Sequence, residues 1–382
     1  MTKSDTLKAL DYSSKPKMGV RLYKKVDTKK ELSLAYTPGI AKVSKAIQAD
    51  DKKLFDYTFV RNNLAVISEG SAVLGLGNIG HKASYPVMEG KAMLFKKFGD
   101  IDAIPIIIKT QEVKKFVKIV KNIADSFGAI NLEDIAAPRC FEIEKALVDA
   151  LDIPVMHDDQ HGTAIVVSAA LINALKLVPK KGKKTKIVIV GAGAAGTAVT
   201  KLLVKHGFKN IIVCDSKGVI SKKRRDLNWA KKELLKITNP DNLTGLLGKA
   251  IKDAGVFIGL SQPEVISEKD IKRMSLKPII FAMANPTPEI MPEKAIKAGA
   301  AIVGTGRSDF KNQINNALAF PGLFRGAMDA KVKITDRLKL QAVKAIVKYQ
   351  ENVLGINNLL PEVLDKKVHR LIAKEVYKEA QK

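Results

Sequence analysis

The feature that most constrains this chain is a glycine-rich turn between a predicted strand and a predicted helix. Residues 186–196 read KIVIVGAGAAG, in which apolar β-branched residues are followed by the spacing G-x-G-x-x-G. A helix is predicted over 197–205 and a second strand over 211–214. A buried strand, a tight glycine turn and a helix in this order indicate a Rossmann-like dinucleotide-binding domain.

Each glycine of this turn has a separate physical role. Gly191 permits the tight turn, Gly193 lets the backbone approach a pyrophosphate, and Gly196 lets the helix pack closely on the strand. The start of the helix attracts the anionic ligand. We therefore predict that the dinucleotide binds along the whole turn, at Gly191, Ala192, Gly193, Ala194, Ala195 and Gly196.

An acidic residue stands at the end of the second strand. Asp215 follows Gly196 by 19 residues, which is the expected place for the acid that binds the ribose hydroxyls. Its charge favours NAD, because it repels the 2′-phosphate of NADP. Ser216 and Lys217 beside it could tolerate that phosphate. We therefore expect NAD as cofactor, with NADP possible.

The rest of the chain alternates between strand-like and helix-like segments, which predicts an α/β fold. We expect an N-terminal α/β catalytic domain over residues 1–160 and a Rossmann-like domain with a parallel sheet over 161–382, with helical segments at both ends. Long helices are predicted over 113–127 and 162–177. Strands are predicted over 65–68, 103–108, 129–131, 187–190, 211–214, 256–259, 279–282 and 301–303.

The net charge of +26 raises the alternative of a nucleic-acid-binding protein. Of the 65 basic residues, however, 55 are lysine and only 10 are arginine. A protein that reads bases or phosphates through bidentate contacts is expected to enrich arginine. We therefore expect no nucleic-acid partner and interpret the charge as a lysine-rich solvated surface.

The expected cellular compartment follows from sequence features that are not found in this chain. No run of about 18 apolar residues predicts a membrane span, and the polar start does not resemble a signal peptide. The two cysteines, Cys140 and Cys214, stand in unrelated contexts without metal-ligand spacing. We expect a cytoplasmic protein with no membrane partner.

Two acidic pairs follow strand-like stretches in the first half of the chain, Glu133–Asp134 and Asp158–Asp159. Four carboxylates at the ends of two strands suit a hard divalent cation such as Mg²⁺ or Mn²⁺. His157 and His161 flank the second pair and could indicate zinc. Without a cysteine set, structural roles fit these histidines better.

Six separate sequence blocks then resemble the signature blocks of the malic enzymes, in particular the short, single-module prokaryotic type. They follow one another in that family's order and at roughly its spacing. The blocks are AYTPGIA (35–41), GLGNIG (75–80), PVMEGKAMLF (86–95), INLEDIAAPRCFEIE (130–144), HDDQHGTA (157–164) and ANPTPE (284–289).

The resemblance implies catalytic and substrate-binding roles for four residues. Tyr36 matches the family's acid and Lys91 its general base, with Lys91 also contacting substrate. Asn285 matches a residue near both substrate and nicotinamide, and Asn316 matches a contact to a substrate carboxylate. Family likeness also suggests a homodimer in which Tyr36 and Lys91 meet across the interface.

The resemblance also divides the four carboxylates by role. Glu133, Asp134 and Asp159 match the metal ligands, whereas Asp158 matches a supporting neighbour that orients the site. One departure concerns substrate binding. Larger members carry an arginine beside the first glycine block, where this chain has Ser71 and Ala72. Arg139, Arg307 and the lysines therefore stay open as the cation that binds the substrate carboxylate.

The activity implied is that of an NAD(P)-dependent malate dehydrogenase (decarboxylating). L-Malate would be oxidised to oxaloacetate at the metal, lose CO₂ to give enolpyruvate, and be protonated to pyruvate. Malolactic conversion and oxaloacetate decarboxylation on the same site are alternatives. An ordinary malate dehydrogenase fits less well, since that family uses a histidine–aspartate pair without metal.

Overall fold

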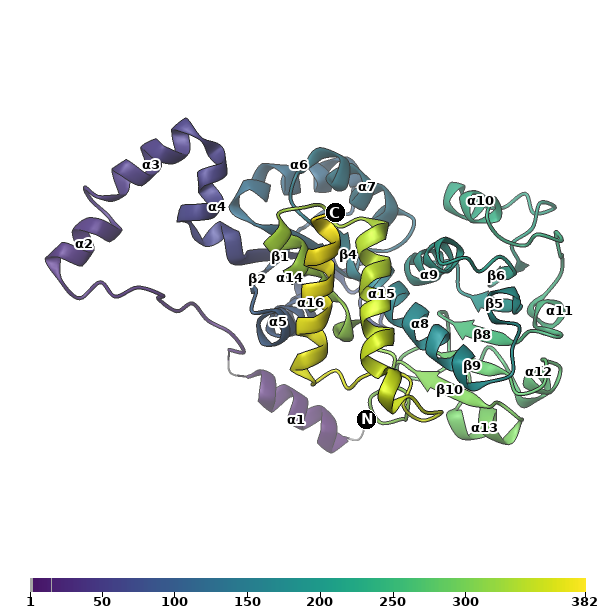
Figure 1. Ribbon diagram of the computed structural model, residues 1–382. Helices are drawn as coiled ribbons and strands as arrows, with labels where there is room; N and C mark the ends of the chain where they lie inside the picture. Colours follow the sequence, from purple (N-terminus) through teal and green to yellow (C-terminus); the bar gives the residue numbers. More distant parts are fainter. Residues whose placement is uncertain (1–2, 15) are drawn as a thin grey trace.

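The computed structural model describes residues 3–14 and 16–382, and its framework is two separate sheets (Figure 1). The first sheet has the strand order β2-β1-β3-β4 and is wholly parallel. The second has the order β10-β9-β8-β5-β6-β7, in which only β7 runs antiparallel. The strands are β1 (Asn63–Ser68), β2 (Asp102–Ile107), β3 (Ala129–Leu132), β4 (Val155–His157), β5 (Ile187–Val190), β6 (Ile211–Asp215), β7 (Gly218–Val219), β8 (Val256–Gly259), β9 (Ile279–Ala282) and β10 (Ile302–Thr305).

The predicted α/β class and its parallel sheets are confirmed. All eight predicted strands are present, each within two residues of its expected ends. The two strands that the sequence did not predict, β4 and β7, are three and two residues long. Segments this short leave no alternation of apolar and polar residues to detect.

Both faces of the second sheet are covered, which explains why its strands β5, β8 and β9 are apolar at every position. In β5, Ile187 and Ile189 belong to the buried cluster that includes residues of α8 and α9. Val188 and Val190 point the other way and join a cluster with α11, α12 and α13. Successive side chains of a strand alternate between faces, so a strand buried on both faces needs an unbroken apolar run.

Helix α8 (Asp158–Leu177) joins the two sheets (Figure 1). It begins directly after β4, leads toward β5, and packs against α9 (Ala194–Lys205) and α15 (Asp336–Gln350). The predicted helix began four residues later, at Gly162, so that prediction was wrong at its start. A Cβ atom at Gly162 would overlap Oδ1 of Asp158, so the glycine makes room for an aspartate inside the first turn.

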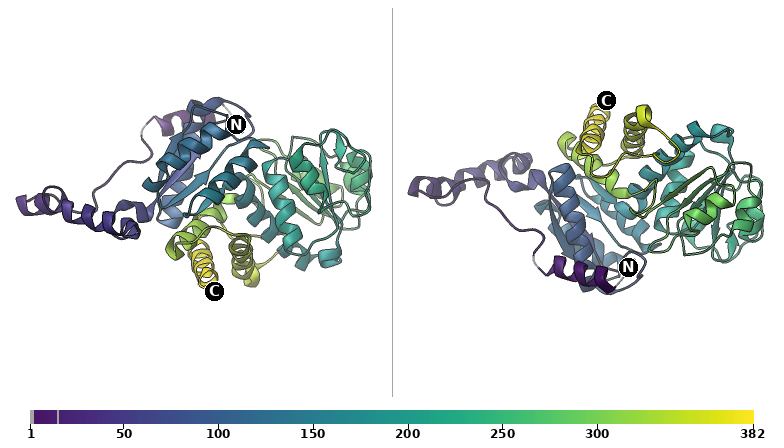
Figure 2. Two further views of the ribbon diagram at one scale, coloured as in Figure 1. Left: turned by 90° about the horizontal axis from the view of Figure 1, so that it is seen from above. Right: turned by 90° about the horizontal axis from the view of Figure 1, so that it is seen from below.

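The C-terminal helices return to the first sheet. Helices α14 (Phe320–Ala330) and α16 (Lys366–Ala380) pack against each other and against α5 (Gly80–Gly99) (Figures 1 and 2). The remaining helices of the body are α6 (Val113–Ile123), α7 (Arg139–Ala150), α10 (Trp229–Leu235), α11 (Leu247–Ile251), α12 (Glu268–Lys272) and α13 (Pro292–Lys297). The division of the chain at residue 160 stays a prediction, because α8 crosses it.

Two of the N-terminal helices are set apart from the body (Figure 2). Helices α2 (Lys29–Ala35) and α3 (Ile40–Ala49), here called the N-terminal arm, project away from both sheets in every view (Figures 1 and 2). Neither contains a buried residue. Helices α1 (Lys3–Ser13) and α4 (Leu54–Tyr57) precede and follow the arm. None of the helices described is long and apolar enough to cross a membrane.

Candidate active site

The candidate site lies at the carboxyl edge of the first sheet. Strands β3 and β4 are adjacent and parallel, so the residues that follow them meet at the same edge. Glu133 and Asp134 follow β3, and Asp158 and Asp159 occupy the first turn of α8 after β4. Ligands of open α/β sheets bind at this edge, near the point where the strand order reverses. Here that reversal lies between β1, which leads to β2 on one side, and β3, which leads to β4 on the other.

Three of the four acids form a compact cluster. Glu133, Asp134 and Asp159 each offer an oxygen atom within 4.8 Å of the others. The first two are buried, and burial together with the charge of Asp159 raises the pKa of Asp134 to about 7. A cavity of about 570 Å³ opens beside the cluster.

The cluster suits a hard divalent cation. All three ligand atoms are carboxylate oxygens, the ligand type that Mg²⁺ and Mn²⁺ prefer. Oδ2 of Asp134 is buried and has no hydrogen-bond partner among the residues that the structure describes, so it is available to a cation. Asp159 Oδ2 accepts the backbone N–H of Asp134 at 2.8 Å and thereby steadies that residue's left-handed backbone, with φ of 55°.

Lys91 lies buried beside this cluster, with 8% of its side chain exposed. Its Nζ is 2.5 Å from Asp158 Oδ2 and 2.9 Å from Glu133 Oε1, and it stands 4.3 Å from the ring centre of Phe320. Burial lowers the pKa of Lys91, but the carboxylates of Asp158, Glu133 and Asp159 outweigh it, and the pKa is raised. The ammonium form is therefore the stable one in this arrangement.

The position of Lys91 on α5 carries a sequence signal that is easily missed. Met88, Ala92 and Phe95 form the buried face of α5, and Lys91 falls in the same row at i+3 and i−4. A charged residue on an apolar face is buried only when it is paired. The periodicity of α5 is therefore a sequence signal for a buried, paired lysine at this position.

Asn316 completes the contacts around Lys91. Its side-chain amide donates a hydrogen bond of 2.7 Å to Asp158 Oδ2, the same oxygen that Lys91 binds. Asn316 also lines the cavity. Six of the predicted site residues therefore lie together: Lys91, Glu133, Asp134, Asp158, Asp159 and Asn316.

Asn285 lies in an exposed loop after β9, across from the first glycine block. Gly75 packs so closely on the carbonyl oxygen of Asn285 that a Cβ atom there would overlap it. Arg307 Nη1 donates a hydrogen bond of 2.7 Å to the carbonyl oxygen of Pro286 in the same loop. The block at residues 75–80 therefore contacts the loop at 284–289 through Gly75.

Tyr36 is not brought to Lys91 within the described chain. It follows α2 on the N-terminal arm, with 69% of its surface exposed, and the arm projects away from the body (Figure 1). Arg139 is engaged by residues outside the carboxylate cluster, since its Nη2 is 3.3 Å from Glu69 Oε1 and 3.4 Å from Gln111 Oε1. Ser71 donates to the same Glu69 carboxylate.

The dinucleotide turn has the geometry that its glycines predicted. Gly191 has φ of +111°, and a Cβ there would overlap the carbonyl oxygen of Leu260, at the end of β8. A Cβ at Gly196 would overlap the carbonyl oxygen of Gly191, whereas Gly193 borders open space. The turn therefore leaves room for a pyrophosphate where the strand order of the second sheet reverses. Helix α9 begins at Ala194, three residues earlier than predicted.

Comparison with known proteins shows to which family the chain belongs. Residues 15–148 match the family model of the malic enzyme N-terminal domain, and residues 160–381 match that of the malic enzyme NAD binding domain. The chain is 52% identical to a bifunctional malic/malolactic enzyme of Bacillus subtilis (strain 168), covering 92% of this chain and 86% of the relative. It is 50% identical to an NAD-dependent malic enzyme of Geobacillus stearothermophilus, covering 93% and 74%.

Solved structures agree. A crystal structure of an NAD-dependent malic enzyme from Thermotoga maritima superposes with a TM-score of 0.93 at 47% identity, covering 99% of both chains. A malic enzyme from Pyrococcus horikoshii Ot3 gives 0.95 at 46% identity, covering 99% of this chain and 90% of that one. The chain belongs to the malic enzyme family.

One residue of this malic enzyme fold that the sequence did not single out is Glu144, on α7. Its carboxylate accepts hydrogen bonds from the backbone N–H of His157 at 2.8 Å, from Gln160 at 3.0 Å and from His161 Nε2 at 2.9 Å. Lys339 lies 3.1 Å from His161 Nδ1, so Nε2 carries the proton that His161 donates to Glu144. His161 therefore has structural surroundings, whereas the buried ring of His157 has its Nε2 3.5 Å from Asp159 Oδ2.

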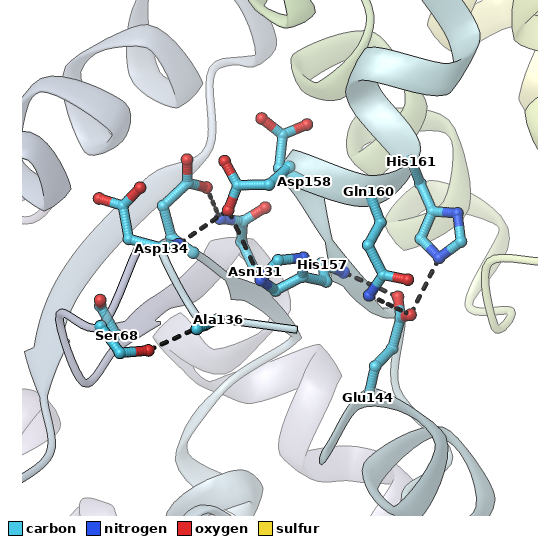
Figure 3. Close-up of polar contacts among 12 residues, drawn as sticks. Ser68, Asn131, Asp134, Ala136, Glu144, His157, Asp158, Gln160 and His161 are labelled. Carbon is cyan, nitrogen blue, oxygen red and sulfur yellow. Dashed lines mark hydrogen bonds and ion pairs between the residues drawn. The ribbon is translucent and has the colours of Figure 1, made fainter. Parts of the chain in front are cut away.

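Figure 3 shows where Glu144 lies relative to the acids of the site. Asp134 and Asp158 lie on one side of the start of α8, while Glu144, Gln160 and His161 lie on the other. The carboxylate thus holds the turn that presents the acids to the cavity. One sequence signal marks Glu144, since it is an acid at the end of the family block at residues 130–144. In the structure, the neighbouring acids of α7, Glu142 and Asp149, are exposed.

Replacing Glu144 with alanine should destabilise the protein. Three polar hydrogens at the start of α8 would lose their acceptor in a buried place, which costs about 3 kcal/mol. Urea unfolding of Glu144→Ala against wild type measures this. The matched control is Lys145→Ala on the same helix, which breaks only the exposed ion pair with Asp149 and should change little. Equal stability of Glu144→Ala and wild type would contradict the assignment.

Proposed function

We propose that this chain catalyses the oxidative decarboxylation of L-malate to pyruvate and CO₂, coupled to the reduction of a nicotinamide dinucleotide. The observation that carries the proposal is the buried ion pair of Lys91 with Asp158 and Glu133, placed at the three-carboxylate cluster and the cavity. The names of its relatives, which include NAD- and NADP-dependent malic enzymes, support the same reaction.

Two bound groups supply chemistry that side chains lack. Glu133, Asp134 and Asp159 would hold Mg²⁺ or Mn²⁺, and the turn at Gly191–Gly196 would hold the dinucleotide, with NAD expected from Asp215 and NADP as the alternative. When bound, the dinucleotide accepts a hydride and the divalent cation polarises the hydroxyl and keto oxygens of the substrate.

Lys91 is proposed as the group that takes the proton from the C2 hydroxyl of malate. It is buried, it borders the cavity, and its Nζ is already fixed by two carboxylates. Glu133 belongs both to this ion pair and to the proposed ligand set. A divalent cation held by Glu133 would compete with Lys91 for that carboxylate and lower the pKa of Lys91, so that its neutral amine could accept the proton. Asp158 stays with Lys91 and orients it.

The asparagines are proposed to align the substrate. Asn316 lines the cavity while its amide is held by Asp158, so its position relative to Lys91 is fixed. Asn285 lies in the loop that the first glycine block contacts and would face both substrate and nicotinamide. Of the cations left open by the sequence, Arg307 contacts this loop and pairs with the exposed Asp309, whereas Arg139 pairs with the buried Glu69. We therefore favour Arg307 for the substrate carboxylate.

Tyr36 is proposed to protonate C3 of enolpyruvate, and to do so in a neighbouring subunit of a homodimer. The N-terminal arm contains no buried residue, yet it exposes Leu32, Leu34, Tyr36 and Ile40. An amphipathic helix pair without a core of its own is stabilised by packing on another surface. A second copy of this chain would supply that surface and bring its own Lys91 to Tyr36.

A second activity has one observation in its favour. The relative at 52% identity is a bifunctional malic/malolactic enzyme, which makes malolactic conversion the alternative for this site. Oxaloacetate decarboxylation would use the same residues without hydride transfer. We also propose a cytoplasmic location, supported by two buried cysteines without a disulfide, Cys140 and Cys214.

Lys91→Ala should abolish malate oxidation, because the proton acceptor is removed while Asp158 and Glu133 are left without their cation. Tyr36→Phe should instead impair the later protonation and retain oxidation of malate. The measurement is a coupled assay of CO₂ and NAD(P)H from L-malate with Mn²⁺. Near-normal turnover by Lys91→Ala would overturn the base assignment, and lactate formation without accumulation of NADH would favour the malolactic alternative.

Mixing the two variants tests whether the site is shared between subunits. If Tyr36 acts on the partner's Lys91 site, a heterodimer of Lys91→Ala and Tyr36→Phe contains one site with both residues intact. Conversion of malate to pyruvate should then reappear after the purified variants are co-refolded. Each heterodimer should show up to about half the specific activity of wild type. No recovery in a preparation shown to contain heterodimers would sink the shared site.

Loss of a proposed ligand should weaken metal binding. Asp159→Asn replaces a charged ligand with a neutral amide. Even the loss of a residue that only hydrogen-bonds to a metal ligand typically lowers the metal affinity about 10–100-fold. We expect at least that loss, measured as free Mn²⁺ by electron paramagnetic resonance during titration. Asp149→Asn, an equal change of charge on exposed α7, is the control. Unchanged Mn²⁺ affinity in Asp159→Asn would remove this residue from the ligand set.

A further inference from the structure

Glu289 is an acid that is buried without a cation beside it. It is fully buried, and no ion pair connects it to a lysine, arginine or histidine of the described chain. Its Oε1 accepts the backbone N–H of Ser261 at 3.0 Å, and its Oε2 accepts the backbone N–H of Ala284 at 2.9 Å. Burial raises the pKa of Glu289, and these N–H groups partly offset the rise. The two hydrogen bonds are the contacts that compensate for burying the carboxylate.

The two N–H groups belong to the ends of neighbouring strands. Ser261 lies two residues after β8 and Ala284 two residues after β9, and these strands are adjacent and parallel. Strand β8 ends at Gly259, where a Cβ atom would overlap Cδ of Glu289. The glycine therefore leaves space for the carboxyl group at the end of β8. One carboxylate thus ties two strand ends together at the carboxyl edge of the second sheet.

The end of β8 borders the proposed dinucleotide site. The backbone N–H of Leu260 donates to the carbonyl oxygen of Val190 at 2.7 Å, and the carbonyl oxygen of Leu260 lies against Gly191 of the glycine turn. The strand order of the second sheet reverses between β5 and β8, and ligands of open α/β sheets bind in the crevice at such a point. Ser261 follows Leu260 directly and is exposed. The backbone that Glu289 binds there is therefore at the edge of this crevice.

The end of β9 leads directly to Asn285. The last backbone hydrogen bond between the two strand ends joins the N–H of Met283 to the carbonyl oxygen of Gly259 at 3.1 Å. The bond from Ala284 to Glu289 follows it and extends the connection by one residue. Asn285 is the next residue and lies in the exposed loop. The carboxylate therefore makes the last connection between β8 and β9 before Asn285.

We propose that Glu289 is a positioning residue that fixes Asn285 relative to the dinucleotide turn by holding the ends of β8 and β9 together. Being buried, it acts through these two strand ends and contacts neither substrate nor dinucleotide. An acid suits this role because a carboxylate offers two acceptor oxygens to two N–H groups, whereas a glutamine would turn its NH₂ group toward one of them. The inference rests on the proposed function, in which Asn285 faces both malate and nicotinamide.

Glu289→Gln tests the role, because it keeps the size of the side chain and breaks one of the two hydrogen bonds. The rate of malate oxidation at saturation should fall on the order of tenfold, since a misplacement of about 1 Å can cost about 10²-fold in rate. The dissociation constant of the dinucleotide should stay within about twofold, because the glycine turn is unchanged. Isothermal titration without malate measures this constant and counts the binding sites. Rates are expressed per site, so that unfolded protein does not enter the comparison.

Two further measurements separate positioning from a general loss of stability. With L-malate deuterated at C2, the isotope effect on kcat should be at least as large in Glu289→Gln as in wild type, because hydride transfer is the step that is slowed. Hydrogen exchange followed by mass spectrometry should become faster only in the peptides that contain Ser261 and Ala284. General destabilisation would instead speed exchange throughout the second sheet.

Two other variants complete the experiment. Glu293→Gln makes the same chemical change at an exposed position in the first turn of α13, and this matched control should behave as wild type. Glu289→Asp keeps the charge, but it is one CH₂ group too short to reach both strand ends. It should lower the rate per site to a smaller extent, and it replaces Glu289→Gln in all measurements if that variant does not fold.

The outcomes distinguish this inference from the proposed function. A wild-type rate per site in Glu289→Gln, or a lower rate with a smaller isotope effect, would overturn the positioning role and leave the proposed function standing. A weaker affinity for the dinucleotide with an unchanged rate at saturation would also overturn it, since Glu289 would then serve binding. Absence of malate oxidation in wild type would overturn the proposed function and this inference with it.

Discussion

The burial of one ammonium group among four carboxylates is the interaction on which the rest of the site depends. An unpaired buried charge costs several kcal/mol, so Lys91 is stable in its place only while Asp158 and Glu133 stay within ion-pair distance. These three residues come from α5, from the end of β3 and from the first turn of α8. The electrostatic requirement therefore fixes three separate elements around one cavity.

Helix α8 is the element that carries this arrangement to the rest of the molecule. Its first turn presents Asp158 and Asp159 to the cavity, while Glu144 binds the opposite side of the same turn. The remaining turns are largely buried and pack on α9, which begins at the dinucleotide turn. One rigid helix thus sets the distance between the carboxylate cluster and the proposed dinucleotide site, as hydride transfer requires.

Two residues that were identified from motifs show that the chemical role of a residue depends on the side chains around it. Asp215 occupies the place of an acid that binds ribose, yet Arg224 and Lys231 fill its lone pairs. Tyr36 stands in a family block, yet it lies exposed on an arm whose helices have no residue buried by the described part of the chain. A motif identifies a residue type at a backbone position, whereas its chemistry is set by neighbours that are distant in sequence.

The sequence by itself determined the α/β class, eight of the strands, the glycine turn and the family, because each depends on local spacing of apolar residues, glycines and short blocks. It also placed the acidic pairs at strand ends. Only the tertiary structure decided that Lys91 is buried against Asp158, that Glu144 holds the start of α8, and that Asp215 is neutralised. These are contacts between residues from 9 to 67 positions apart, and their energies depend on burial and on partner atoms, which no local pattern encodes.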